Sequence, residues 1–152
     1  AFEHCVKFVE TLRGSQHPLV YAGPNAYDTK EYPGFVHMAL AALVSAGHVD
    51  GIISYTSNCL LGMAGVPDAN LCKIWDPRKN AVDREAVGRA VGMLQQCDLC
   101  LILGTNLTET PLEIFEAMQN VGKRGGPIVV CTPEESYLDT ASRYKFDLRP
   151  LE

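Results

Sequence analysis

Three short polar segments follow apolar runs in this sequence, and they contain its most chemically suggestive residues. The run 99–103 ends in Gly104-Thr105-Asn106, the run 18–22 in Gly23-Pro24-Asn25, and the run 51–55 in Thr56-Ser57-Asn58. Short, dense apolar runs are typical of strands buried on both faces of a parallel sheet. Ligands of open α/β sheets bind just beyond the carboxyl ends of such strands.

Gly23, Gly104, Thr105 and Asn106 are therefore candidates to contact a nucleotide phosphate or ribose. A glycine lets the backbone approach a ligand, and Thr and Asn supply short hydrogen-bonding groups. The same glycines could instead serve the geometry of a strand-to-helix turn alone. Tyr21 and Pro24 count against phosphate binding, because a bulky side chain and a missing donor stand where bare N–H groups are needed.

The cysteines and histidines offer weaker signals. Six cysteines (5, 59, 72, 97, 100 and 131) fall mostly in apolar stretches, which is typical of buried free thiols in a reducing compartment: the cytoplasm or an organelle matrix. Cys97 and Cys100 have the C-x-x-C spacing, but a structural zinc usually needs a second such pair. His37 is interpreted as structural or surface. The other histidines have no acid at suggestive spacing, so we predict neither a metal site nor a catalytic residue.

The elements that position these residues alternate between strands and helices. We predict helices over 2–12, 34–46, 60–64 and 110–121, and one capped by Asn80 that runs through Leu94. Strands are predicted at 18–22, 51–55, 71–75, 99–103 and 127–131, with an edge strand at 144–148. This order predicts one domain over 1–152, a three-layer, Rossmann-like α/β fold with a parallel sheet of about five or six strands and helices on both faces.

Composition narrows the function classes. The 152 residues are 47% hydrophobic and 20% charged, and the net charge of -5 gives no support to nucleic-acid binding or to binding of an anionic membrane. No apolar run approaches the roughly 20 residues of a membrane span. No cleavable signal peptide is recognisable, and a start at Ala1 rather than Met is compatible with a processed form or a fragment.

The chain resembles the sirtuins, NAD-dependent protein deacylases of the deoxyhypusine-synthase-like NAD-binding fold. Its segment 97–107 matches the family's A-D-L-x-L-x-L-G-T-S-L, and 33–47 matches a Pro, a His and a Leu-rich helix that ends in Gly. The segment 21–25 takes the place of the family's G-A-G-I-S loop, and 54–58 that of T-Q-N-x-D. The resemblance adds Ala22, Asn25, Thr56 and Asn58 to the predicted cofactor-binding residues.

Departures from the family pattern argue against deacylation. Trp75 stands where the resemblance places the catalytic histidine, and an indole has no nitrogen that accepts a proton near neutral pH. Tyr21 replaces the first glycine of G-A-G, and Cys131 replaces an Asn that would hold the cofactor ribose. The family's two C-x-x-C pairs are absent between Trp75 and Cys97, so the zinc-binding small domain is not expected.

Three hypotheses follow. The first is a catalytically inactive sirtuin-like domain that serves as a structural or interaction subunit of a larger protein assembly, with no cofactor. The second is a regulatory module that binds NAD or ADP-ribose without turnover. The third is an enzyme of the same fold with different chemistry, which would need a titratable residue of perturbed pKa in a cleft.

Overall fold

The structure is a computed structural model that describes residues 2–27, 31–56 and 58–147. Its centre is a six-stranded sheet with the order β3-β2-β1-β6-β7-β8, in which every neighbouring pair is parallel. The strands are β1 (Pro18–Ala22), β2 (Gly51–Ser54), β3 (Leu71–Lys73), β6 (Leu99–Leu103), β7 (Ile128–Cys131) and β8 (Tyr144–Phe146). The predicted three-layer α/β architecture is confirmed.

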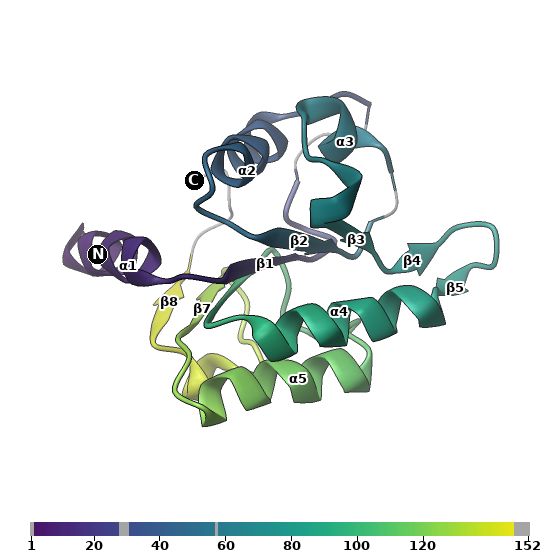
Figure 1. Ribbon diagram of the computed structural model, residues 1–152. Helices are drawn as coiled ribbons and strands as arrows, with labels where there is room; N and C mark the ends of the chain where they lie inside the picture. Colours follow the sequence, from purple (N-terminus) through teal and green to yellow (C-terminus); the bar gives the residue numbers. More distant parts are fainter. Residues whose placement is uncertain (1, 28–30, 57, 148–152) are drawn as a thin grey trace.

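Helices cover both faces of this sheet (Figure 1). The helices α4 (Arg84–Gln96) and α5 (Leu112–Lys123) lie side by side on one face, and α2 (Phe35–Ser45) and α3 (Leu60–Ala64) lie on the other. Each pair closes its own apolar cluster, so the strand residues alternate between two cores. Every residue of β1 is buried, which explains its uninterrupted apolar run. Among the described residues, no helix has the length and apolar character that crossing a membrane requires.

The helix α1 (Phe2–Gly14) lies apart from the two layers, beside β8 (Figure 1). Phe8 packs edge-on against Phe146, and His4 against Tyr144. The predicted helix over 2–12 is confirmed. Two of its apolar residues, Val6 and Val9, are 41% and 43% exposed, because helical periodicity alone does not show whether a neighbour covers an apolar face.

The region between the third strand and α4 differs from the prediction. The strand β3 stops at Lys73, and Trp75 belongs to a separate antiparallel hairpin made by β4 (Trp75–Asp76) and β5 (Ala81–Val82). Asn80 lies in the turn of this hairpin with a φ of 48° and does not cap α4. Asp83 is the cap instead: its carboxylate accepts the N–H groups of Glu85 and Ala86.

The residues Thr110-Pro111-Leu112-Glu113 match the pattern of a capping box at the start of α5, but the structure does not form one. Thr110 donates its hydroxyl to the Tyr21 hydroxyl, and Glu113 pairs with Arg84 of α4, so both side chains make tertiary contacts in place of local ones. Pro111 occupies the N-cap position, and the helix continues past Gly122 to Lys123. Of the predicted edge strand 144–148, Tyr144–Phe146 is confirmed and Leu148 lies outside the described residues.

The turns that follow β1 and β6 pack closely against each other. Gly104 has a φ of +64°, and a Cβ placed on it would lie 2.2 Å from the backbone nitrogen of Ala26. A Cβ on Gly23 would lie 2.4 Å from the Cβ of Thr105. Real Cβ atoms do not approach other atoms this closely, so both positions require glycine.

We therefore expect Gly104→Ala to lower the free energy of unfolding by about 3 kcal/mol or more, because it combines a steric clash with a left-handed φ. Urea denaturation measures the change. Gly88→Ala is the matched control, since a Cβ there meets open space within α4 and should raise stability by about 1 kcal/mol. Equal stabilities for the two variants would contradict the close approach of the two turns.

Candidate functional site

The eight residues predicted to bind a cofactor lie at the carboxyl edge of the sheet. Ala22 pairs with Ser54 on one side and with Leu103 on the other, so the segments after β1, β2 and β6 are neighbours. Those residues are Ala22, Gly23, Asn25, Thr56, Asn58, Gly104, Thr105 and Asn106. Their shared location follows from the parallel sheet, while their role as ligand contacts stays a prediction.

The turn after β1 uses its backbone donors internally. The N–H of Gly23 donates to the Leu103 carbonyl at 2.9 Å, that of Asn25 to the Gly104 carbonyl at 2.9 Å, and that of Ala26 to the Gly23 carbonyl at 3.2 Å. Pro24 has no N–H. Four consecutive residues therefore present no unused backbone donor to a ligand.

Asn58 and Asn106 have side chains that serve local turns. The Asn58 amide oxygen accepts the N–H of Leu60 at 3.2 Å. The Asn106 oxygen accepts both the N–H and the hydroxyl of Thr108, and its nitrogen donates to Glu134 at 2.8 Å. These bonds are typical of Asx turns, which form at strand and helix ends without any ligand.

A network of rings and hydroxyls covers the start of α2. His37 is fully buried, and its ring stacks on Tyr27 with centroids 4.0 Å apart. The Nδ1 atom of His37 accepts the N–H of Gly34, just before the helix. The Tyr27 hydroxyl lies 3.4 Å from Ser54, and Ser54 lies 3.3 Å from Thr56. Burial raises the pKa of Tyr27 to about 12, so its hydroxyl stays neutral. His37 is therefore not a surface residue, and its structural role stays a prediction.

Glu109, on the loop between β6 and α5, joins the same edge and was missed by the sequence analysis. Both of its carboxylate oxygens lie 2.7 Å from the Thr105 hydroxyl, and the Tyr21 hydroxyl lies 3.5 Å from one of them. The Tyr21 side chain is fully buried toward α4 and α5 and does not reach into the β1 turn. Burial raises the pKa of Tyr21 far above its usual value, and the neighbouring Glu109 charge raises it further.

Two aromatic rings, Tyr55 and Trp75, stack on each other beyond the carboxyl end of β2. Tyr55 follows β2, and its N–H donates to the Ala22 carbonyl at 2.9 Å. Its ring stacks on Trp75 with centroids 5.7 Å apart and planes inclined by 28°. Burial raises the pKa of Tyr55, and the charge of Glu109 raises it further. The Trp75 indole is half-buried against this ring.

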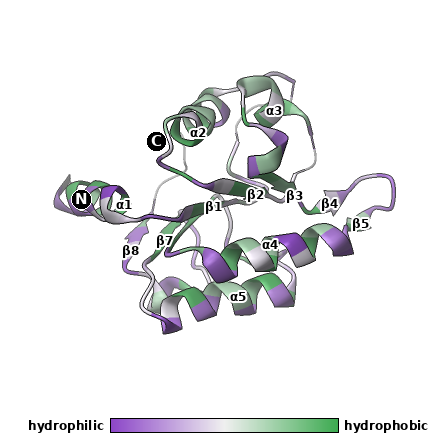
Figure 2. Cartoon of the chain, viewed as in Figure 1, coloured by the Kyte–Doolittle hydropathy of each residue, from purple (hydrophilic) through white to green (hydrophobic). Residues whose placement is uncertain are grey.

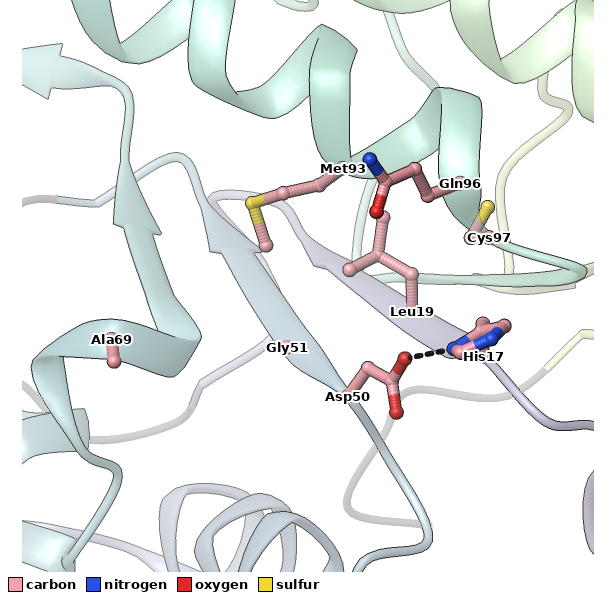
Figure 3. A pocket seen from close by; sticks show the side chains of 8 residues that line it. All are labelled: His17, Leu19, Asp50, Gly51, Ala69, Met93, Gln96 and Cys97. Carbon is pink, nitrogen blue, oxygen red and sulfur yellow. Dashed lines mark hydrogen bonds and ion pairs between the residues drawn. The ribbon is translucent and has the colours of Figure 1, made fainter.

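A pocket also lies at the opposite, amino edge of the sheet, between β1, β2 and the end of α4 (Figure 3). It has a volume of about 180 Å³, and within it His17 Nδ1 lies 2.7 Å from an Asp50 carboxylate oxygen, a contact that residue spacing did not suggest. Cys97 lines the pocket, but its sulfur points away from the His17 ring and donates to the Leu94 carbonyl. Burial raises the pKa of the Cys97 thiol to about 11, so these three residues do not form an activated nucleophile.

The remaining cysteines divide between core and surface. Cys72 and Cys100 are buried, and burial raises the pKa of both thiols. Cys5 and Cys59 are exposed and Cys131 is half-buried, so the expectation that most thiols are buried is wrong for these three. Among the described residues, no group of three or more His, Cys, Asp or Glu side chains is placed to hold a metal ion.

Comparisons with known proteins identify the fold. No protein-family model and no curated protein sequence matches the chain. Among solved structures it is similar to one described under the mechanism and regulation of Sir2 enzymes, with a TM-score of 0.83, 14% identity, and 99% of this chain and 93% of the other covered. It is also similar to Sir2 bound to acetylated peptide, with a TM-score of 0.79 and 14% identity over 96% of this chain and 93% of the other. A third similar structure is a Sir2–p53 peptide–NAD+ complex, with a TM-score of 0.78 and 14% identity over 95% of this chain and 93% of the other. The chain thus has the sirtuin fold, and the expected structural resemblance is confirmed.

Near the amino edge of the sheet, Asp98 ties the start of β6 to the turn between α1 and β1. It accepts hydrogen bonds from the Ser15 hydroxyl and from the N–H groups of Gln16 and His17, the last two at 2.8 and 2.9 Å. Desolvation acts to raise the pKa of Asp98, but these hydrogen bonds outweigh it and hold the pKa below its usual value.

We expect Asp98→Asn to reduce stability by about 1–2 kcal/mol near neutral pH, a range that allows for solvent screening. A carboxyl group with a lowered pKa stabilises the fold above its unfolded-state pKa of about 3.9, and this contribution is lost as the pH falls through the folded-state pKa. Urea denaturation of both proteins from about pH 7 down to about pH 2 should show the difference shrink. Exposed Asp68 provides the control substitution, Asp68→Asn, and a difference that grows on acidification would be incompatible with this role of Asp98.

Proposed function

We propose that this chain is a catalytically inactive domain of the sirtuin fold that serves as a structural or interaction subunit of a larger protein assembly. The observation that carries the proposal is the turn after β1. Diphosphates of bound dinucleotides are held by free backbone N–H groups at such a turn and at the following helix start. Here the N–H groups of Gly23, Asn25 and Ala26 are already bonded within the protein, and Pro24 lacks one.

Charge supports the same conclusion. The carboxylate of Glu109 lies within hydrogen-bond distance of Thr105, one of the predicted cofactor contacts. A second negative charge at this edge is repelled, and the repulsion is strong where water is partly excluded. The start of α2 is the other place that could receive a phosphate. There the N–H of Gly34 donates to His37 Nδ1, and the His37 ring stacks on Tyr27.

The hairpin that contains Trp75 supports the absence of deacylase chemistry. The resemblance places Trp75 at the position of the family's catalytic histidine, and its indole is a donor with no acceptor nitrogen. The chain between β3 and α4 is only long enough for β4 and β5, which supports a single domain over 1–152 without a zinc-binding module. The buried thiols of Cys72, Cys97 and Cys100 support a reducing compartment, the cytoplasm or an organelle matrix.

The outer surface of α2 supports an interaction role. This helix contains no Asp, Glu, Lys or Arg, and its exposed side is apolar (Figure 2). Phe35 and Met38 lie one turn apart and are 71% and 54% exposed, and Met63 of the adjacent α3 is 63% exposed. A helix that is apolar all round is normally covered on both sides, so this surface is suited to contact another protein subunit.

Calorimetric titration with NAD and with ADP-ribose tests the loss of cofactor binding. We expect no saturable heat and no rise in unfolding temperature at millimolar ligand, because a ligand present at 100 times its dissociation constant would stabilise the fold by about 2.7 kcal/mol. An active sirtuin titrated in the same buffer is the positive control. Saturable binding in the micromolar range would contradict the proposal and favour the regulatory module that binds NAD or ADP-ribose.

Size-exclusion chromatography of native cell extract tests the assembly role. The tagged full chain should elute in a complex much larger than the chain itself, and the double variant Phe35→Ser/Met38→Ser should elute as free protein. Both side chains are exposed, so the substitutions should change stability by no more than about 0.5 kcal/mol. Leu112→Ser, at the equally exposed start of α5, is the control and should leave the complex intact. A wild-type chain that elutes alone would count against an assembly subunit.

A further inference from the structure

Glu109 lies where the topology of the sheet creates a ligand site. The strand order β3-β2-β1-β6-β7-β8 runs outward in both directions from the β1–β6 pair, so the chain crosses to opposite sides of the sheet there. In open α/β sheets, ligands bind at the carboxyl end of such a switch point. Tyr21 of β1 and Thr105, just after β6, meet Glu109 at this point.

Among the residues that the structure describes, the partners of the Glu109 carboxylate are neutral groups. The Thr105 hydroxyl donates to it, and the Tyr21 hydroxyl, itself the acceptor of the Thr110 hydroxyl at 3.2 Å, lies at hydrogen-bond range. No described Lys, Arg or His forms an ion pair with it, whereas nearby Glu113 is paired with Arg84. A partly buried carboxylate without a cation gains more from a cationic partner than an exposed one does, because less water screens the pair.

The neighbouring rings select the kind of cation. Tyr55 and Trp75 are half-buried, stack on each other and keep part of their surface accessible. Tyr55 packs against the apolar cluster that contains Tyr21, and the Tyr21 hydroxyl lies 3.5 Å from the Glu109 carboxylate, so the ring and the carboxylate share this neighbour. Aromatic faces attract organic ammonium groups, whose alkyl carbons also pack on the rings, whereas divalent metals require several oxygen ligands. No described cluster supplies such a ligand set.

We propose that Glu109, Tyr55 and Trp75 form a binding site for an organic ammonium group, such as the side chain of a lysine or a small alkylamine. The carboxylate accepts hydrogen bonds from the ammonium N–H groups. The aromatic pair contacts the methylene chain of the ligand, including the carbon bonded to the ammonium nitrogen. This site is additional to the assembly role, since the apolar surface of α2 and α3 lies on the other face of the sheet.

Trp75 is the only tryptophan of the chain, so its fluorescence reports directly on the site. The full chain is titrated with n-butylammonium chloride, and separately with NaCl at the same ionic strength. We expect a saturable change with butylammonium alone. Glu109→Gln should weaken the apparent affinity by about tenfold or more, because it removes the charge and keeps the shape. Glu113→Gln, the matched control on the neighbouring helix, should bind as the wild type does.

Tyr55→Leu keeps the proposal testable if Glu109→Gln fails to fold, as judged by its thermal unfolding. It removes one aromatic face and should weaken binding several-fold. The capped peptide N-acetyl-Ala-Lys-Ala-amide, whose only ammonium group is the lysine side chain, separates the two sources: tighter binding than butylammonium supports a lysine side chain, and equal binding supports a free amine. A linear response, or a wild-type affinity in Glu109→Gln, would overturn the site. ADP-ribose is titrated on the same samples, so that a failure of the ammonium site can be distinguished from a failure of the proposed loss of cofactor binding.

Discussion

The contact between the turns after β1 and β6 is the constraint on which the rest of the structure depends. These two strands are the centre of the sheet, and their register brings Ala22 beside Leu103. The chain must then leave both strands at the same place, in opposite directions. It does so because Gly23 and Gly104 have no side chains, and a Cβ on either would lie within 2.4 Å of another atom. The loops that carry Thr105, Asn106 and Glu109 are positioned by this contact.

The same contact changes the meaning of the glycines. A glycine at a strand end allows either a ligand or a neighbouring turn to approach the backbone closely. Both cannot occupy the same space, so one excludes the other at a given backbone atom. In this chain the N–H of Asn25 donates to the Gly104 carbonyl, so the second use is the one observed. A phosphate-binding turn and a packed turn can therefore share a fold and even a glycine pattern while they differ in which hydrogen bonds are free.

The sequence predicted the parts of the fold that depend on local pattern. The apolar runs located β1, β2, β6 and β7 to within a residue or two, because a strand buried on both faces leaves no other pattern. It failed where a side chain had a tertiary alternative. Thr110 and Glu113 match a capping box, yet they bond to Tyr21 and Arg84, which are distant in the chain.

Of the candidate site, the location of the eight residues was predictable from parallel topology. Glu109 and the His17–Asp50 pair were not, because their partners lie 4 to 88 residues away and no spacing rule links them.

Glu109 shows how one charge can redirect a site without a change of fold. A carboxylate next to Thr105 repels a diphosphate and attracts an ammonium group, so the preference of the carboxyl edge follows the sign of a single side chain. The fold fixes where a ligand would lie, since the switch point between β1 and β6 is set by the strand order. The loop residues fix what kind of ligand it would be. Likeness to Sir2 structures at 14% identity therefore indicates where a ligand would lie. The kind of ligand is inferred instead from Glu109, Tyr55 and Trp75.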